Sequence, residues 1–434
     1  MTRDVSDRAA RGRGSPTRRA AIVLGATSAT ILAGAAAFIL FGPHYRGGPV
    51  PVRAFAADLP GRIAADQRYL TQAPGDATVW AELGIGYVEQ ARRTGDAAYY
   101  PKAEQALRES LRLQPETNDT ALVGMAALTG ARRDFAGSRD WATRATTANP
   151  RNPLAHGLLS DAYLQLGDTR RADGELQKML EAKPGVASFT RAAELYRLRN
   201  ERDRAAQALN LALDSAVGSA DLADVRSRLG DLAWDSGWPN RSLRAYDLAL
   251  RAEPGHPDAL AGRARALAAL HREDEALTAY AAAVARHPRP QTLLEYGELY
   301  QSLGRTGEAQ AQYRGVRGAL SQLAAKGVVD DLVAGRFEAD HGDPAVAVTR
   351  LAREWKRRPN DEVADAYAWA LHRAGRNQEA IKYARQNTAL AAYHRGEIER
   401  ALGREADAER SRARALKLNP HFSPLYAQEV ADGR

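Results

Sequence analysis

Residues 152–184 read NPLAHGLLSDAYLQLGDTRRADGELQKMLEAKP, and this stretch decides the fold. Apolar residues recur in it at intervals of three, four and six positions: Leu159, Tyr163, Leu166, Ala172, Leu176 and Met179. Steps of three and four place side chains on one stripe of an α-helix. Gly167 separates the two halves and Pro184 follows the second, as is typical of helix ends. The stretch therefore predicts two amphipathic helices joined by a tight turn.

The same pattern returns at a fixed period along the chain. The interval from Pro150 to Pro184 equals that from Pro254 to Pro288, and the interval from Pro184 to Pro254 is close to twice as long. One helix pair cannot bury its own apolar face, so successive pairs must stack. A period of about 34 residues predicts an all-α solenoid.

These repeats resemble the tetratricopeptide repeat (TPR) family, whose first helix carries Trp, Leu, Gly and Tyr and whose second carries Ala, an aromatic residue, Ala and Pro. Three units show the series: Trp80, Leu83, Gly84, Tyr87, Ala103, Leu107, Ser110 and Pro115; Leu229, Gly230, Ser242, Tyr246, Ala249 and Pro254; Leu260, Ala264, Leu267, Ala276, Tyr280, Ala283 and Pro288. The resemblance covers most of residues 76–420. It implies a right-handed superhelical solenoid of about ten TPR-like helix pairs with one continuous core.

The position of Gly230 illustrates the packing that the repeats require. A small residue there lets two helices approach, and larger residues fill the grooves beside it. We expect Gly230→Leu to overpack this contact. Gly230→Ala should be tolerated, because Ala264 occupies the same position in the next unit.

Three segments precede the repeats. Residues 1–19 are arginine-rich and are predicted to be a disordered, basic cytoplasmic tail. Residues 20–41 carry no charge, and as a helix they would reach about 33 Å, against a hydrocarbon core of about 30 Å. They therefore predict a transmembrane helix. Residues 42–60 form a Pro/Gly-rich spacer, and residues 61–434 form the solenoid with its capping helices.

The flanking arginines predict how this anchor is oriented. Six arginines precede the run, and only Arg46 and Arg53 follow closely. The positive-inside rule then gives a single-pass protein of the cell membrane, with a cytoplasmic N-terminus and an extracytoplasmic solenoid. Two alternatives stay open. A signal peptide cleaved near Ala35-Ala36-Ala37 would give a secreted protein, and Arg18-Arg19 hints at twin-arginine export.

Composition excludes several classes of function. The chain has no cysteine, which excludes disulfides, thiolate metal sites and thiol nucleophiles. Its net charge is +8, but residues 1–53 contribute +6, so residues 54–434 carry about +2. A nucleic-acid-binding protein needs a concentrated basic face on its folded part, and we predict no nucleic-acid partner. Arginine far outnumbers lysine, which is typical of a GC-rich bacterial genome.

The sequence contains no motif for catalysis or cofactor binding. Phosphate-binding loops, nucleophile elbows and His-Glu-x-x-His spacings are absent. Glu338, Asp340, His341 and Asp343 crowd one expected helix–helix turn, where polar residues belong in any case. Oxygen-ligated metals need ligands that converge from several directions. We therefore predict no metal, no cofactor and no enzymatic activity.

The resemblance also implies a binding surface, because the first helix of each TPR unit lines a concave groove. The residues expected there are Asp224, Ser227, Asp231, Trp234 and Asp235, joined by Asp161, Glu194, Arg197 and Arg265 from neighbouring units. An acidic groove with one tryptophan favours a basic or aromatic-containing segment. The rival interpretation is a merely solvated face.

The predicted function is a membrane-anchored scaffold for protein–protein interactions at the outer face of a bacterial cytoplasmic membrane, with a protein or peptide ligand in the groove. The alternative is an exported protein that acts as the regulatory or substrate-binding subunit of an envelope enzyme.

Overall fold

The computed structural model describes residues 58–427, which belong to one compact unit. The predicted cytoplasmic tail, the uncharged run 20–41 and most of the spacer lie outside these residues. Within the described range the chain forms twenty-one helices and no strand, which confirms the all-α prediction. None of these helices combines the length and the apolar character needed to cross a membrane.

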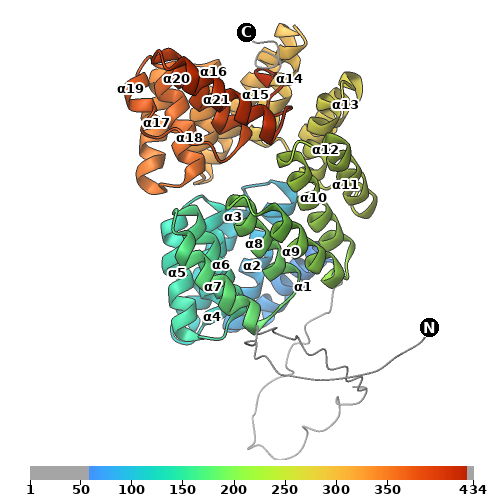
Figure 1. Cartoon of the computed structure of the whole chain (residues 1–434). Coiled ribbons are helices and arrows are strands. Elements are labelled where there is room, and N and C mark those ends of the chain that lie inside the picture. The colour runs from blue at the N-terminus through green and yellow to red at the C-terminus, as the bar shows by residue number, and fades with distance from the viewer. Residues whose placement is uncertain (1–57, 428–434) are drawn as a thin grey trace, which may run out of the picture. The chain divides into compact units, whose positions relative to one another are not determined.

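Ten helix pairs follow α1 (Leu59–Gln72), in agreement with the predicted number, and Figure 1 shows them in chain order. The pairs are α2 (Ala77–Thr94) with α3 (Tyr99–Leu113), α4 (Asp119–Ala131) with α5 (Phe135–Ala148), α6 (Pro153–Gln165) with α7 (Thr169–Ala182), α8 (Val186–Leu198) with α9 (Arg202–Ser215), α10 (Ser219–Asp235) with α11 (Pro239–Ala252), α12 (Pro257–Ala269) with α13 (Glu273–Arg286), α14 (Pro290–Ser302) with α15 (Thr306–Ala325), α16 (Asp331–His341) with α17 (Pro344–Arg357), α18 (Asp361–Arg373) with α19 (Asn377–Ala380), and α20 (Ala389–Ala401) with α21 (Glu405–Leu418). We number them as units one to ten.

Helix boundaries in the third unit follow the local signals in its sequence. The Asn152 side chain caps α6 by accepting a hydrogen bond from the Leu154 amide at 3.0 Å. Gly167 takes a left-handed conformation, with φ of 81°, directly after α6. Asp168 then caps α7 by accepting from the Arg171 amide at 2.9 Å. The predicted helix–turn–helix is confirmed.

The first helix begins two residues earlier than the predicted start of the solenoid at residue 61. The Asp58 side chain caps it by accepting from the Gly61 amide at 2.8 Å, and Pro60 lies in its first turn. Proline is tolerated there because the first amides of a helix have no intrahelical partner. The proline that suggested a spacer is thus part of the helix.

Each helix pair carries two small buried residues, one on each helix, at equivalent positions of the repeat. The ten pairs are Gly84 and Ala103, Ala126 and Ser138, Ser160 and Ala172, Ala193 and Ala205, Gly230 and Ser242, Ala264 and Ala276, Gly297 and Ala309, Gly335 and Ala347, Ala368 and Ala380, and Gly396 and Ala408. Ser242 also ties its pair together, because its hydroxyl donates to the Gly230 carbonyl at 2.9 Å. These positions confirm the assigned register of the repeat.

The expected tolerance of Gly230→Ala is wrong. A Cβ atom on Gly230 would lie 2.5 Å from the Tyr246 ring. That ring is fully buried, and its hydroxyl donates to Asp231 at 2.6 Å, so it is held in place. The ring leaves room for glycine only, although Ala264 fits the same position one unit later.

The buried apolar residues form several clusters along the chain rather than the single continuous core that we expected. The largest spans α11 to α16 around Tyr246, Tyr280 and Tyr313, and another fills the last three units around Leu351 and Trp369. Repeat units contact mainly their neighbours, so each cluster spans only a few successive units.

The ninth unit is shortened in its second helix. α19 contains four residues, whereas α17 in the unit before it contains fourteen. The chain then continues through turns to α20. This explains why the interval from Ala380 to Ala408 is shorter than the period that the proline spacings give.

Units far apart in the sequence also meet, along a line that we call the seam. The Arg358 guanidinium donates to the Gln165 side chain at 2.6 Å, and the Asn360 amide group donates to the Gln165 carbonyl at 2.9 Å. Three further contacts belong to the seam: Gly95 with His287, Arg133 with Asp330, and Asn419 with the Trp234 carbonyl. In Figure 1, α17 and α18 accordingly lie above α5 and α6.

Two glycines with a left-handed backbone conformation allow the chain segments on either side of the seam to approach closely. At Gly167 a Cβ atom would lie 2.6 Å from the Pro359 carbonyl oxygen, and at Gly237 it would lie 2.9 Å from the Pro420 ring. Both glycines have positive φ, of 81° and 71°. The turns that the sequence assigns to helix termination therefore also form contacts between distant units.

Candidate functional site

The first helices of successive units lie side by side and form one surface, which we call the first-helix face. In each unit, the residue after the small one on the first helix belongs to this face: Asp161, Glu194, Asp231, Arg265, Glu298, Arg336, Trp369 and Glu397 in units three to ten. Contacts between units connect this row. Arg265 lies 3.5 Å from Asp231 and 3.8 Å from Glu295, and His341 lies 3.4 Å from Glu298.

A pocket of about 210 Å³ opens on this face over units four to six. Three helices supply its charged residues and its tryptophan: α8 gives Glu194 and Arg197, α10 gives Arg228, Asp231, Trp234 and Asp235, and α12 gives Arg265. Its floor consists of small and apolar residues, including Ala193, Ala205 and Leu209. Three carboxylates thus face three guanidinium groups around one indole ring.

Arg197 bridges two units at the edge of the pocket. Its guanidinium donates to Glu194 on the same helix and to Asp235 on α10, both at 2.8 Å. Burial raises the pKa of Glu194, but Arg197 and Arg228 outweigh burial, and the net pKa lies below its usual value. Arg228 is in turn held by Asp224 at 2.9 Å. Glu194, Arg197 and Arg228 are therefore charged and already paired.

Arg265 is held more loosely than Arg197 and Arg228. Its distances to Asp231 and Glu295 exceed those of ordinary hydrogen bonds. Its buried Nε has no hydrogen-bond partner among the described residues. The guanidinium lies 5.3 Å from the centre of the Trp234 ring, in cation–π range. The two terminal nitrogens of Arg265 lie 3.5 Å and 3.8 Å from these carboxylates, so they retain donor capacity for a ligand.

Tyr246, which lies beneath the pocket, forms a hydrogen bond with Asp231. The tyrosine hydroxyl donates to its carboxylate at 2.6 Å. Burial raises the pKa of Asp231 above its usual value, although Arg265 and this hydrogen bond act in the opposite direction. Asp231 thus links the pocket to the helix-packing contact at Gly230.

The structure brings six of the predicted residues into one pocket: Glu194, Arg197, Asp231, Trp234, Asp235 and Arg265. Asp224 lies behind Arg228. Asp161 lies apart from the pocket, where it pairs with Arg191 at 2.8 Å. Ser227 is buried rather than exposed on the face.

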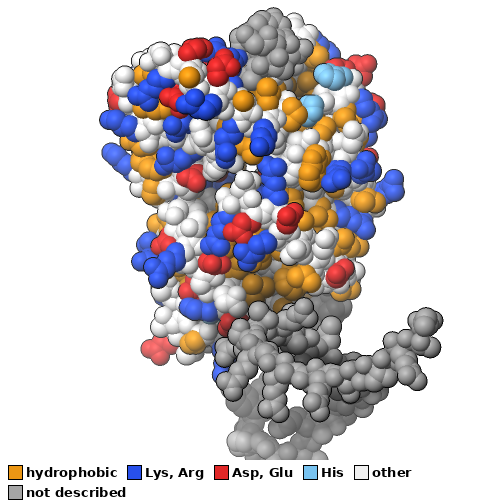
Figure 2. All heavy atoms as spheres, viewed as in Figure 1, with side chains coloured by type: hydrophobic (Ala, Val, Ile, Leu, Met, Phe, Trp, Pro, Cys, Tyr) orange, Lys and Arg blue, Asp and Glu red, His pale blue; other side chains and the backbone are white. Residues whose placement is uncertain are grey.

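The acidic character expected for this groove needs correction. Arg191 and Arg228 were missed, and with Arg197 and Arg265 they neutralise most of the carboxylates. The signal for Arg228 is its place four residues after Asp224, the spacing of helical ion pairs. On the molecular face in Figure 2, Lys and Arg side chains are likewise interspersed with Asp, Glu and apolar ones.

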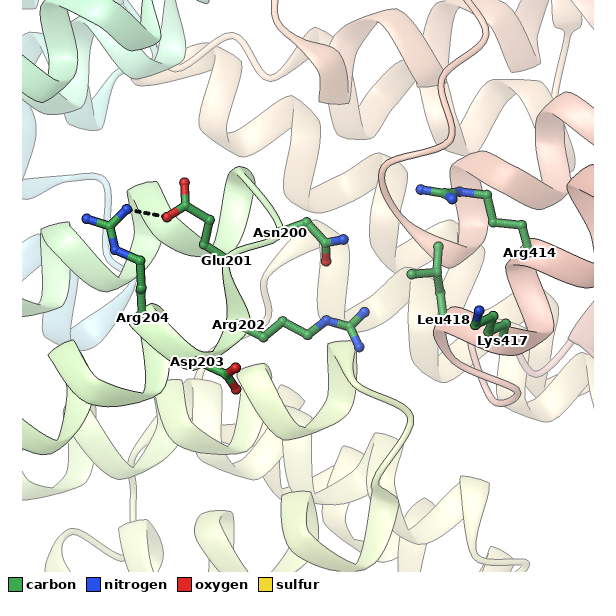
Figure 3. A pocket seen from close by; sticks show the side chains of 8 residues that line it. All are labelled: Asn200, Glu201, Arg202, Asp203, Arg204, Arg414, Lys417 and Leu418. Carbon is green, nitrogen blue, oxygen red and sulfur yellow. Dashed lines mark hydrogen bonds and ion pairs between the residues drawn. The ribbon is translucent and has the colours of Figure 1, made fainter.

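A second cavity, of about 580 Å³, lies between the turn before α9 and helix α21. Figure 3 shows Asn200 and Arg202 facing Arg414, Lys417 and Leu418 across it. Arg202 is bonded to the Asp235 carbonyl, and Arg414 to the Gln386 carbonyl. This cavity is a wide opening beside the seam; the backbone holds two of its four cations, and Arg204 pairs with Glu201.

The four polar residues considered as metal ligands point to different partners. Glu338 accepts from the Asp343 amide at 3.0 Å, Asp340 accepts from the Trp369 indole at 2.9 Å, and His341 faces Glu298. No group of three or more His, Asp or Glu side chains within residues 58–427 is arranged to hold a metal ion.

Comparisons with known proteins give structural likeness only. No family model and no curated protein matches the chain. Among solved structures, human IFIT1 in its dimer with PPP-AAAA is 16% identical with a TM-score of 0.47, and the match covers 79% of each chain. Yeast Tom70 is 13% identical with a TM-score of 0.43, over 87% of this chain and 89% of that one.

A third match, YrrB, is described as a TPR protein with an unusual peptide-binding site. It is 18% identical with a TM-score of 0.29, over 43% of this chain and 97% of that one. With TM-scores below 0.5, none of these likenesses bears on what this chain does.

Proposed function

We propose that this protein is a scaffold that binds a peptide segment of another protein on its first-helix face. The observation that carries this proposal is the pocket over α8, α10 and α12, where the loosely held terminal nitrogens of Arg265 lie beside Trp234. Solenoids bind along such extended faces. We infer no catalytic role, since the pocket groups pair with one another rather than form a nucleophile–base arrangement.

The chemistry of the pocket favours a ligand with acceptor oxygens rather than the basic segment expected from the sequence. Its three carboxylates and three guanidiniums balance, so net charge selects neither sign. The free capacity lies on Arg265, which presents N–H donors only. A peptide carbonyl or carboxylate at Arg265, with an apolar group against Trp234, uses that capacity.

Site-specific photo-crosslinking tests this function in cells. A benzophenone amino acid replaces Trp234, and in the control it replaces Trp238, which is half-exposed on the turn before α11. We expect an adduct with a distinct partner protein from position 234 only. Adding Arg265→Ala should weaken that adduct at equal protein level. Adducts from position 238 alone would show that the partner binds at the turns. Adducts from neither position would contradict binding in the pocket.

We further propose that residues 20–41 anchor the protein in the cell membrane with the solenoid outside. The absence of charge throughout this run and the excess of arginines before it support this orientation. Protease added to intact spheroplasts should digest the repeats. If the repeats are digested only after the membrane is disrupted, the solenoid lies on the cytoplasmic side and the proposed orientation is wrong. N-terminal sequencing of the mature protein separates the anchor from a cleaved signal peptide.

A further inference from the structure

The C-terminal segment, residues 421–427, folds back over the first-helix face. Asn419, just after α21, directs it: its side chain donates to the Trp234 carbonyl at 2.8 Å and accepts from the His421 amide at 2.8 Å. The chain then turns at Ser423, whose hydroxyl accepts from the Leu425 amide at 3.1 Å. Residues 424–426 form a turn that leads to Ala427, whose amide donates to the Ser423 carbonyl at 3.2 Å as in a helix.

This segment places two aromatic residues, Phe422 and Tyr426, against the last units. Tyr426 stacks on Tyr393 of α20, with ring centres 5.0 Å apart and planes 18° apart. The edge of Trp369 on α18 meets the Tyr426 ring at 6.0 Å. Phe422 contacts Tyr393 from another side, at 5.4 Å. A pocket for one phenol ring is therefore built from α18 and α20.

Asp340 on α16 provides the polar end of this pocket. Its carboxylate accepts from the Trp369 indole N–H at 2.9 Å and from the Tyr426 hydroxyl. Burial and the neighbouring Asp340 raise the pKa of Tyr426, so the hydroxyl stays protonated and donates. The charge of Glu298 also contributes to the raised pKa of Tyr426, and Arg373 lies 3.6 Å from Asp340. The pocket accepts a neutral phenol and disfavours an added negative charge.

The same surface forms the open pocket in units four to six. Trp369 occupies the repeat position of Asp231 and Arg265, and Asp340 occupies the position of Asp235. The segment belongs to none of the ten helix pairs, and its rings stay partly exposed. Phe422 and Tyr426 pack against the core of the last units, and the segment lies on the continuation of the first-helix face, where a ligand would lie.

We infer that the face over α16, α18 and α20 is a second peptide site, selective for a segment with an unphosphorylated tyrosine, and that residues 421–427 of the chain itself occupy it. A partner segment with the same spacing of aromatic residues must displace Tyr426 to bind here. The site shares no side chain with the pocket around Arg265, so the two are tested separately.

Separating the segment from the chain tests this inference. A chain that ends at Pro420 keeps Asn419 and its contact with Trp234. A fluorescent peptide of residues 421–434 should bind this shortened chain saturably, as measured by anisotropy. The full chain should bind the peptide at least about tenfold more weakly, because its own segment competes.

Peptide variants give the specificity. Tyr426→Ala removes the ring contacts and the hydrogen bond, and should weaken binding about tenfold or more. Phosphotyrosine at position 426 should also abolish binding, because it places a dianion against Asp340 and Glu298. Pro424→Ala is the matched control, because Pro424 is exposed and should leave affinity unchanged.

Circular dichroism decides whether the segment is instead part of the core. Full helicity of the shortened chain and of full-length Tyr426→Ala supports a ligand role. Loss of helicity in both would overturn it. The proposed peptide site would also be contradicted if the folded, shortened chain did not bind the peptide, or if it bound the Tyr426→Ala peptide equally well.

Discussion

At the scale of single residues, the packing of each helix pair depends on one small side chain and the larger side chain beside it. Gly230 and Tyr246 show how narrow the tolerance is, since the repeat permits alanine at this position while this unit does not. The reason is the hydrogen bond from Tyr246 to Asp231, which holds the ring against the glycine and joins packing to the pocket.

Gly230→Ala should therefore destabilise the protein by about 1–3 kcal/mol through overpacking. Gly174→Ala is the control: it lies inside α7 with no atom within 4 Å of the added Cβ. There alanine should stabilise by up to about 1 kcal/mol through helix propensity. Thermal unfolding of both variants checks this, and equal melting of Gly230→Ala and the parent would contradict the Tyr246 contact.

His287 predicts how stability responds to pH. Burial first, and then Arg289, lower the pKa of His287 from 6.5 to about 4. The unfolded chain thus binds a proton between pH 6.5 and pH 4 that the folded chain refuses. The contribution of the neutral His287 side chain to the free energy of unfolding is therefore complete above pH 6.5, and it is lost as the pH falls toward 4. His287→Asn should flatten the decline in unfolding midpoint across this range, relative to the parent.

His271→Asn is the control for that series, because the His271 side chain is 83% exposed. Its pH dependence should match the parent. His372 and His421 also have pKa values lowered by burial, so a residual decline should persist in His287→Asn. If the unfolding midpoint of His287→Asn declined with pH as steeply as that of the parent, His287 would not be buried against the Gly95 turn.

At the scale of elements, α19 shows what happens when one repeat loses most of a helix. Four helical residues provide few internal hydrogen bonds, and helices this short depend on tertiary contacts. Ile381 and Tyr383 take over part of the packing after α19, against the core of the last units. Within residues 377–388, backbone hydrogen bonds continue past α19 only as far as the Ala384 amide, which donates to the Ala380 carbonyl at 3.1 Å.

Amide hydrogen exchange should report this difference directly. Residues 377–388 should exchange about tenfold faster or more than α17, which has a complete ladder of hydrogen bonds. Mass spectrometry of peptides covering both segments measures the ratio. Equal protection would mean that 377–388 opens only together with its neighbours.

At the scale of the whole described structure, the seam converts a chain of nearest-neighbour contacts into one with long-range contacts. Residues 165 and 358 interact directly, and so do residues 234 and 419. Arg358 is 2% exposed and its partner Glu354 is 1% exposed, so this ion pair is buried where the seam closes. Breaking a buried pair is costly because one charge remains uncompensated.

Substitutions at two left-handed glycines distinguish the contribution of the seam to stability from the cost of local backbone strain. Gly167→Ala and Gly304→Ala both impose a left-handed conformation on alanine, which costs about 1–2 kcal/mol. Only Gly167→Ala also presses a Cβ against the Pro359 carbonyl, while Gly304 has open space around it. Gly167→Ala should therefore melt lower than Gly304→Ala.

Distance measurements show whether the seam opens. The chain has no cysteine, so spin labels attach only where Arg170→Cys and Lys356→Cys place them. The distance distribution between these labels should broaden in Gly167→Ala and stay unchanged in Gly304→Ala. Identical distributions in both variants would contradict a closed seam.

The sequence by itself determined the ten helix pairs, their turns and the residues of the first-helix face. These features are local: capping residues such as Asn152 and Asp168 and the spacing of Leu159, Tyr163 and Leu166 act within a few turns of helix. Six of the nine residues predicted for the groove consequently share one pocket.

Only the tertiary structure decided how those charges pair, that the seam closes and that Tyr426 returns to the binding face. Asp161 meets Arg191 across a unit boundary, and Arg358 meets Gln165 across 193 positions. The period of a repeat fixes which faces meet between neighbours. Which distant units meet depends on small rotations summed over many units, and no single stretch of sequence encodes that sum.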